Sequence, residues 1–242
     1  MKTIIVTGAS AGIGRSVAER FLADGWQVGL IARRAELLEE MADGRANAVI
    51  LPCDVAEAEQ VDRAFADFVD KAGRLDVLFN NAGIFTPAAP IDEVPVDDWM
   101  RAVSVNLTGM FLCARAAFGQ MRRQVPQGGR IINNGSISAH APREGAVTYT
   151  TTKHGITGLT RQLALDGRPF DIACGQIDIG NAMTDLLAGI AERARAEGKA
   201  EPPHIDVALV ADAVAQMAAL PLSANVLFQT LMATQMPFVG RG

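Results

Sequence analysis

The sequence predicts one α/β domain, a Rossmann-like, doubly wound parallel sheet with helices on both faces. Short apolar runs alternate with longer amphipathic runs along the chain, which is the β-α-β order of a parallel sheet. The short runs are almost continuously apolar, as expected of strands that are covered on both faces. The 242 residues, 49% of them apolar, suit a single large core, so residues 1–242 are interpreted as one domain.

Each element is predicted from the length and period of its apolar pattern. Strands are expected where a run rich in Val, Ile or Leu is short and ends in turn residues or in a helical pattern. In chain order they are Lys2–Thr7, Gln27–Ala32, Ala48–Pro52, Leu75–Asn80, Arg130–Asn134, Phe170–Ile177 and Asn225–Met232. Helices are expected where apolar residues recur at helical spacing, as Val61, Phe65 and Phe68 do. They are Ile13–Asp24, Ala35–Met41, Glu57–Lys71, Asp97–Gln124, Val147–Leu165 and Val207–Leu220.

The segment Asp178–Pro203 does not follow this alternation. It is rich in Ala, Gly and charged residues, and it closes with two consecutive prolines. Long connections without a clear pattern are often functional, so residues 178–203 are predicted to form a mobile substrate lid. A pair of surface helices is the alternative.

Composition narrows the classes of function. The net charge of −5, from 27 acidic and 22 basic residues, argues against a nucleic-acid-binding protein, which usually presents a basic face. Cys53, Cys113 and Cys174 form no CxxC pair, so reduced thiols are expected rather than a disulfide or a metal site. The first apolar run is too short for a signal peptide, and no membrane span is expected. These features predict a soluble cytoplasmic protein.

A glycine-rich loop follows the first strand. The segment TGASAGIG places Gly8, Gly12 and Gly14 between a strand and a helix, where a dinucleotide requires a tight turn and a close approach to its pyrophosphate. The helix that begins near Ile13 would offer free N–H groups to the phosphates. A turn without a ligand is the alternative, but the strand–loop–helix context favours a dinucleotide site.

The end of the second strand bears on the choice of cofactor. NAD sites have an acid about 20 residues after the glycine loop, which holds the ribose 2′-hydroxyl, whereas an arginine there accommodates the 2′-phosphate of NADP. This chain has Ala32 at the acid position, followed by Arg33 and Arg34. NADP(H) is therefore predicted as the preferred cofactor and NAD(H) is the alternative. The two arginines could also be a solvated helix start.

The chain's single tyrosine, Tyr149, precedes Lys153 by four residues in YTTTK, so both lie on one face of a predicted helix. A phenol has a pKa of about 10 and is a poor acid or base at neutral pH. An ammonium about 4 Å away contributes about 4 kcal/mol at an effective dielectric of 20, enough to lower that pKa by up to about three. The pair therefore predicts an acid/base site. A buried tyrosine beside a lysine without chemistry is the alternative.

Together with NNAG at 80–83, VNLTG and GSIS, these motifs resemble the short-chain dehydrogenase/reductase family, in its single-domain branch, from Thr3 to about Thr184. The resemblance implies an enzyme that interconverts a carbonyl and an alcohol by hydride transfer to or from a nicotinamide cofactor. It implies cofactor contacts at Gly8, Ser10, Gly12, Ile13, Gly14, Arg33, Arg34, Asp54, Val55, Asn81, Ala82, Gly83, Tyr149, Lys153, Ile179 and Thr184.

The resemblance also implies a catalytic set. Tyr149 would exchange a proton with the substrate oxygen, and Ser136 would hydrogen-bond the same oxygen. Lys153 would bind the nicotinamide ribose, and Asn106 would hold a water that relays protons from Lys153. Each has a structural alternative, such as a turn cap for Ser136 and a satisfied core amide for Asn106. Two weaker pocket candidates are His140, with solvent exposure as the alternative, and Phe85, with core packing as the alternative.

Two departures from the family pattern affect the substrate side. Ile179–Gly180 stands where the family has a Pro-Gly pair, and MATQMPFVGRG replaces the usual Asp-Gly-Gly ending. The substrate, a small carbonyl or alcohol, cannot be named from the sequence. The resemblance implies a homotetramer or homodimer, paired through Asp97–Gln124 and Val147–Leu165. The alternative function is a cofactor-binding regulator without turnover; a sugar-nucleotide epimerase is disfavoured because it needs a larger C-terminal domain.

Overall fold

The strands form a seven-stranded parallel sheet in the order β3-β2-β1-β4-β5-β6-β9, which confirms the predicted fold class. The computed structural model describes residues 1–196 and 198–239. The strand order reverses between β1 and β4, which is the switch point where open α/β sheets bind ligands. The strands are β1 Thr3–Thr7, β2 Gln27–Ala32, β3 Ala48–Pro52, β4 Val77–Asn80, β5 Gly129–Asn134, β6 Ile172–Ile179 and β9 Phe228–Leu231.

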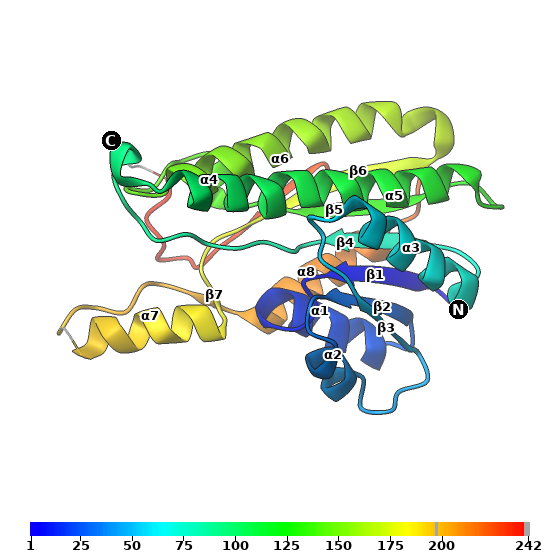
Figure 1. Ribbon diagram of the computed structural model, residues 1–242, viewed down its shortest axis with the longest axis horizontal. Helices are drawn as coiled ribbons and strands as arrows, with labels where there is room; N and C mark the ends of the chain where they lie inside the picture. Colours follow the sequence, from blue (N-terminus) through cyan, green and yellow to red (C-terminus); the bar gives the residue numbers. More distant parts are fainter. Residues whose placement is uncertain (197, 240–242) are drawn as a thin grey trace.

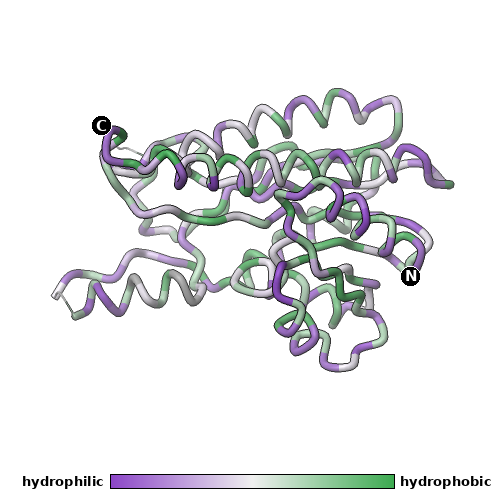
Figure 2. Tube along the Cα trace, in the orientation of Figure 1, coloured by the Kyte–Doolittle hydropathy of each residue, from purple (hydrophilic) through white to green (hydrophobic). Residues whose placement is uncertain are grey.

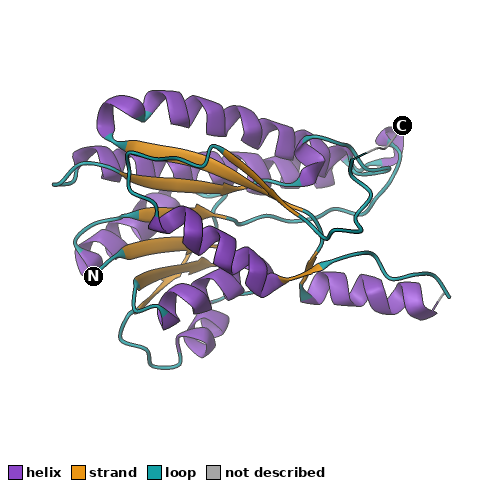
Figure 3. Cartoon of the chain, turned by 180° about the vertical axis from the view of Figure 1, so that it is seen from behind, coloured by secondary structure: helices purple, strands orange, loops and turns teal. Residues whose placement is uncertain are grey.

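The helices cover both faces of the sheet (Figure 1 and, from behind, Figure 3). One core lies under α1, α2 and α8, and the other lies under α3, α5 and α6. The helices are α1 Gly12–Ala23, α2 Ala35–Ala42, α3 Ala58–Ala72, α4 Val96–Val103, α5 Met110–Arg123, α6 Val147–Asp166, α7 Asp185–Ala196 and α8 Val207–Ala219. The bounds of α1, α2, α3, α6 and α8 agree with the predicted ones to within a few residues.

The central strands are apolar on both sides because each side meets a different core. In β1, Ile4 and Val6 pack into the first core, whereas Ile5 between them packs into the second. All three side chains are fully buried. Figure 2 shows the same distribution, with hydrophobic residues concentrated in the central strands and hydrophilic residues more frequent on the outer helices.

The long helix predicted over Asp97–Gln124 consists of α4, a π-helical turn at Ser104–Gly109, and α5. By length and composition alone, Val96–Arg123 is the one helix among the described residues that could cross a membrane. One face of α5 packs into the core, however, where Cys113 and Ala117 are fully buried. A core helix of a folded domain packs in this way.

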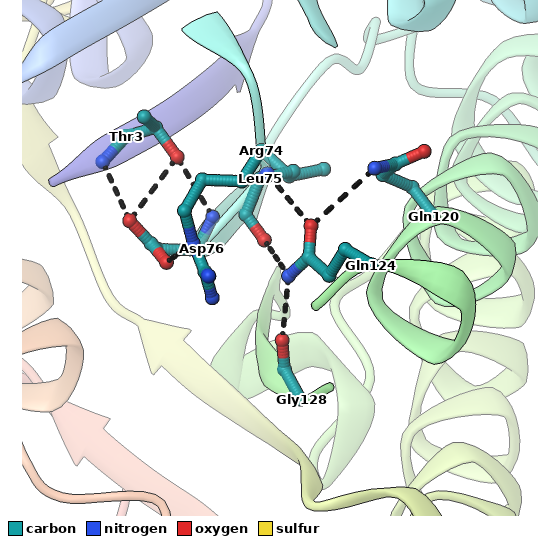
Figure 4. A network of polar contacts seen from close by, with 7 residues as sticks. All are labelled: Thr3, Arg74, Leu75, Asp76, Gln120, Gln124 and Gly128. Carbon is teal, nitrogen blue, oxygen red and sulfur yellow. Dashed lines mark hydrogen bonds and ion pairs between the residues drawn. The ribbon is translucent and has the colours of Figure 1, made fainter. Parts of the chain in front are cut away.

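A polar network at the amino-terminal edge of the sheet joins three elements (Figure 4). The Asp76 carboxylate accepts a hydrogen bond from the backbone N–H of Thr3, and the Thr3 hydroxyl accepts one from the N–H of Asp76. The Gln124 side chain accepts from the N–H of Leu75 and donates to the carbonyls of Leu75 and Gly128. The starts of β1 and β4 are thereby tied to the end of α5, opposite the edge where the loops form the candidate site.

The described part of the predicted lid segment contains one helix, α7, and the first two residues of the segment, Asp178 and Ile179, belong to β6 instead. Helix α7 is flanked by the short parallel strands β7 Ala182–Met183 and β8 Ile205–Asp206, and it projects away from the sheet (Figure 1). The Asn181 side chain donates to the Pro203 carbonyl and the Asn181 carbonyl accepts from the N–H of Ile205, so the two ends of the segment are tied to each other. Residue 197 of this segment, and residues 240–242 of the atypical C-terminus, lie outside the described residues.

Candidate active site

The loops at the carboxyl ends of the strands enclose a cavity of about 620 Å³ at the switch point of the sheet. Nearly all residues predicted to contact the cofactor line this cavity, although they come from segments far apart in the sequence. They are Gly8, Ser10, Gly12, Ile13, Arg33, Arg34, Asp54, Val55, Asn81, Ala82, Gly83, Tyr149, Lys153, Ile179 and Thr184.

The glycine loop has the conformation that the prediction requires. Gly8 and Gly12 have φ angles of +68° and +53°, which residues with a Cβ rarely adopt. The Ala11 N-cap contributes no side-chain hydrogen bond, so the first N–H groups of α1 remain available to an anion in the cavity. Gly14 is the exception among the predicted contacts: it does not line the cavity, and an added Cβ would lie 2.1 Å from the Gly8 carbonyl oxygen. Its role is close packing of α1 on the loop.

Two arginines flank the cavity where β2 ends. Arg33 and Arg34 are exposed and line the cavity, and neither forms an ion pair with another described residue. Asp54 faces the same end; its carboxylate accepts from the Ala56 N–H, and its own N–H donates to the Gln60 side chain. The two positive charges therefore remain free for a ligand phosphate.

The strand ends at the switch point are cross-linked by polar contacts. The Thr7 hydroxyl accepts from the N–H groups of Asn81 and Ala82, at 2.8 and 3.0 Å. The Asn81 side-chain oxygen accepts from the amide of Asn134 at 2.7 Å. The loops that would face a nicotinamide are thus fixed in place before any ligand binds.

Tyr149 and Lys153 both line the cavity from α6. Lys153 is 3% exposed, and its Nζ donates to the Asn134 carbonyl at 2.7 Å. Burial lowers the pKa of Lys153 from 10.5 to about 8, although the charge of Asp178 opposes this. The Tyr149 ring stacks on Phe85, with ring centres 4.4 Å apart and planes inclined by 22°. Phe85 is 50% exposed and lines the cavity, so its role as a pocket wall is supported over core packing.

The direction of the Tyr149 pKa is opposite to the prediction. Burial raises the pKa of the phenol; a hydrogen bond with Ser136 and the charge of Arg143 lower it less, and the charge of Asp178 raises it. The Lys153 ammonium lies 5.5 Å from the ring centre and donates to a carbonyl oxygen, so it does not outweigh the loss of hydration. Tyr149 is therefore protonated at neutral pH in this structure, the form that donates a proton during reduction.

Ser136 lies directly behind Tyr149 and is almost fully buried. Its hydroxyl accepts from the Ser138 N–H and caps the 3-10 helix Ile137–Ala139, so the turn-cap alternative describes one of its contacts. The hydrogen bond with Tyr149 places the same hydroxyl beside the reacting phenol. Ser136 itself is absent from the described cavity lining, whereas its neighbour Gly135 is part of it.

A buried carboxylate that the sequence analysis missed fixes the Ser136 backbone. Asp178 is fully buried and accepts from the N–H of Ser136 at 2.9 Å, from Gln176 at 2.6 Å and from His140 at 2.7 Å. His140 therefore contacts Asp178 instead of lining the cavity. The signal available in the sequence was a charge inside the otherwise apolar β6 run. An added Cβ on Gly135 would lie 2.0 Å from this carboxylate, so the close approach depends on the glycine.

Asn106 lies in the π-helical turn and clamps the loop after β4. Its side chain accepts from the N–H of Ile84 at 2.7 Å and donates to the carbonyl of Ile84 at 2.9 Å. The side-chain amide is satisfied on both sides, as the structural alternative expected.

The buried thiols and the acids do not form a metal site. Cys53, Cys113 and Cys174 are free, and burial raises the pKa of Cys53 to about 11 and that of Cys174 to about 12. No cluster of three or more His, Cys, Asp or Glu that could hold a metal ion occurs in the described ranges 1–196 and 198–239.

Comparisons with known proteins agree with this geometry. A family model described as short chain dehydrogenase matches residues 2–195. The chain is 32% identical over 208 residues to a 3beta-hydroxysteroid dehydrogenase of Mediterraneibacter gnavus, covering 84% of this chain and 73% of that protein. A 3-ketoacyl-(acyl-carrier-protein) reductase of Brucella melitensis complexed with NADH is similar in structure, with a TM-score of 0.86, 25% identity and 96% of each chain covered. The closed form of a serine dehydrogenase complexed with NADP+ has a TM-score of 0.88 and 25% identity, covering 99% of this chain and 98% of that one.

Proposed function

This chain belongs to the short-chain dehydrogenase/reductase family, and on that basis we propose that it is an NADP(H)-dependent oxidoreductase in which Tyr149 is the acid/base. Enzymes of this family interconvert alcohol and carbonyl groups, and this chain is one of them. The observation that carries the proposal is the shared cavity: Tyr149, Lys153 and the glycine loop all line it. The alternative drawn from the sequence, a cofactor-binding regulator without turnover, would not need Tyr149 and Lys153 together in the cavity.

The residues present fit a nicotinamide dinucleotide. The uncapped start of α1 suits the pyrophosphate, and the unpaired Arg33 and Arg34 suit a 2′-phosphate. Lys153 lies where it can donate to the ribose hydroxyls once it leaves the Asn134 carbonyl. When bound, the cofactor supplies or accepts the hydride, and the protein provides orientation and proton transfer.

In the direction of reduction, Tyr149 donates its proton to the substrate oxygen. The phenol is neutral beforehand, because burial raises its pKa. The phenolate that remains is stabilised by the hydrogen bond with Ser136 and by the charge of Arg143. Asp178 holds the Ser136 backbone, and Asn106 holds Ile84, so both residues position groups around the phenol. Oxidation of an alcohol uses the same groups in reverse.

The direct test of the proposal is turnover. The purified protein is incubated with NADPH or NADH and a panel of ketones and aldehydes, and the absorbance of the reduced nicotinamide is followed. Loss of absorbance that depends on enzyme and substrate supports an oxidoreductase. Tight binding of NADPH without turnover of any compound would instead favour the regulatory alternative.

Replacing Lys153 by Met should stabilise the fold at neutral pH while impairing the enzyme. The pKa of Lys153 is about 8 in the folded chain, against an ordinary 10.5. Below pH 8 the lysine is protonated in both the folded and the unfolded chain, and there its burial destabilises the fold by about 3 kcal/mol. The wild-type penalty disappears as pH rises from about 8 to 10.5. We therefore expect the variant to melt at a higher temperature at pH 7, with the difference shrinking by pH 10.5 in thermal denaturation.

The same variant should need a higher pH for alcohol oxidation and should bind NADP+ more weakly, because it removes a cation 5.5 Å from the Tyr149 ring centre that is also proposed to bind the ribose. Lys71→Met on α3, in the last turn of a helix away from the cavity, is the matched control. An unshifted pH profile together with normal cofactor affinity would contradict the role proposed for Lys153.

We expect a homotetramer that pairs through α4, α5 and α6. Along these helices large apolar side chains remain exposed, with Met100 at 58%, Phe111 at 50% and Leu165 at 51%. Large apolar side chains left exposed on the surface suit an interaction surface. Light scattering should return about four times the 25.6 kDa chain mass, and Phe111→Asp should reduce it. A mass of one chain at micromolar concentration would contradict the expectation.

Two further assignments belong to this proposal. The part of the segment 178–203 that follows β6 is proposed as a substrate lid, because Thr184 and Leu187 line the cavity while the rest of α7 projects from the domain (Figure 1). A cytoplasmic location is proposed because the three buried cysteines are free, which suits a reducing compartment.

A further inference from the structure

An arginine that the sequence analysis did not single out lines the cavity beside the reacting phenol. The guanidinium carbon of Arg143 lies 5.7 Å from the centre of the Tyr149 ring. Arg143 is exposed and forms no ion pair with any residue in the described part of the chain. Its charge is strong enough at this position to lower the pKa of Tyr149.

The turn that carries Arg143 is held in place. The N–H of Ala146 donates to the Arg143 carbonyl, and the Gly145 carbonyl accepts from the N–H of Ala89 at 3.1 Å. The hydroxyls of Thr86 and Thr148 are hydrogen-bonded to each other at 2.6 Å across the same junction. The backbone of this turn is therefore tied to the loop after β4, which forms the facing wall of the cavity.

The end of the cavity that Tyr149 lines, called the catalytic end below, is positively charged. Arg143 and Lys153 line it there, and Asp54 is the one acid among the lining residues whose side chains are described. Asp54 lies beside Val55 at the end of the cavity that Arg33 and Arg34 also line. Asp178 offsets part of this charge, since its carboxylate raises the pKa of both Tyr149 and Lys153, but it forms no ion pair with Arg143. A substrate that brings a negative charge would complete this end of the site.

We propose that the substrate is a short oxo acid or hydroxy acid whose carboxylate binds Arg143 while its reacting oxygen meets Tyr149. The inference rests on the proposed function and names its substrate class. A guanidinium binds a carboxylate through two parallel hydrogen bonds and matches its single charge. A phosphate dianion at this end would have only Arg143 to balance its two negative charges, because Lys153 is assigned to the ribose of the cofactor. Because Arg143 lies close to the Tyr149 ring, the carboxylate and the reacting oxygen of the substrate must be separated by only a few atoms.

The test uses matched acids and neutral esters. The compounds are 2-oxobutanoate, acetoacetate and 4-oxopentanoate, each with its methyl ester, assayed with NADPH. The enzymes are wild type, Arg143→Gln, Arg143→Lys and, as a control, Arg168→Gln, an exposed arginine that does not line the cavity. Removing Arg143 also alters the Tyr149 pKa, but that effect is shared by an acid and its ester. The informative quantity is therefore the acid-to-ester ratio of kcat/KM.

For at least one pair, wild type should prefer the acid, and Arg143→Gln should lower the ratio about tenfold to hundredfold, the usual effect of losing a charge-assisted hydrogen bond. Arg143→Lys should retain part of the preference, and Arg168→Gln should retain all of it. Equal use of acids and esters by wild type, or an unchanged ratio in Arg143→Gln, would overturn the inference while leaving the oxidoreductase proposal intact.

Titration calorimetry distinguishes a failure of the substrate inference from a failure of the proposed function. The acids are titrated into wild type and Arg143→Gln saturated with NADP+. Binding that requires both the carboxylate and Arg143 supports the inference even without turnover, in which case the proposed catalytic role of Tyr149 would be the part that failed. If no acid of the panel binds or reacts in preference to its ester, the inference is wrong.

Discussion

Tyr149→Phe is expected to lower kcat at least about a hundredfold, the usual contribution of a positioned acid or base, while NADPH affinity stays close to that of wild type. The variant keeps the ring, so the stacking on Phe85 is retained. It removes only the hydroxyl that is hydrogen-bonded with Ser136 and that would donate the proton. Stopped-flow or steady-state assays give kcat, and fluorescence titration gives the NADPH dissociation constant.

The matched control is Thr150→Val, one residue further along the same helix. The Thr150 hydroxyl is buried without a hydrogen-bond partner among the described residues, so its loss leaves no donor or acceptor behind. This variant should fold and turn over like wild type. If Tyr149→Phe kept more than about a tenth of the wild-type kcat, a different group would have to supply the proton, and the assignment of Tyr149 would be wrong.

The fold could be predicted from the sequence because its signals are local and repeated. Apolar runs such as those of β1 and β2 are short and nearly continuous, and each is followed by a helix, which leaves a parallel sheet as the consistent solution. The π-helical turn at Ser104–Gly109 could not be predicted. Its residues continue a helical pattern, and the change of register depends on contacts that Asn106 makes with Ile84 across the domain.

Most residues that line the cavity could be predicted from sequence motifs, whereas the electrostatic environment of Tyr149 could not. The prediction for Tyr149 considered one charge, Lys153, at an assumed distance, and left out the loss of hydration that raises the pKa of the phenol. Arg143 lies in the loop before the helix that carries Tyr149, and Asp178 lies at the end of the next strand, so only the folded chain reveals that both act on the same ring. Charges that act through space between loops are the part that a single sequence conceals.

Cofactor preference should follow the two arginines at the end of β2. Arg33 and Arg34 line the cavity without ion-pair partners in the described part of the chain, so a 2′-phosphate would meet two free guanidinium groups. A charge-assisted hydrogen bond contributes about 1.5–3 kcal/mol, so wild type should bind NADPH at least about tenfold and up to about a thousandfold more tightly than NADH. Because both arginines are exposed, the preference should weaken as salt concentration rises.

The double variant Ala32→Asp, Arg33→Ser should reverse that preference. A carboxylate at the end of β2 can accept hydrogen bonds from the NADH ribose hydroxyls and repels the phosphate of NADPH, while the serine removes one of the two cations. Titration calorimetry of wild type and variant with both cofactors measures the effect, and Arg45→Ser, at an exposed arginine that does not line the cavity, controls for a general loss of positive charge. If wild type bound NADH and NADPH equally well, the arginines would not recognise the 2′-phosphate, and the NADP(H) preference proposed here would be wrong.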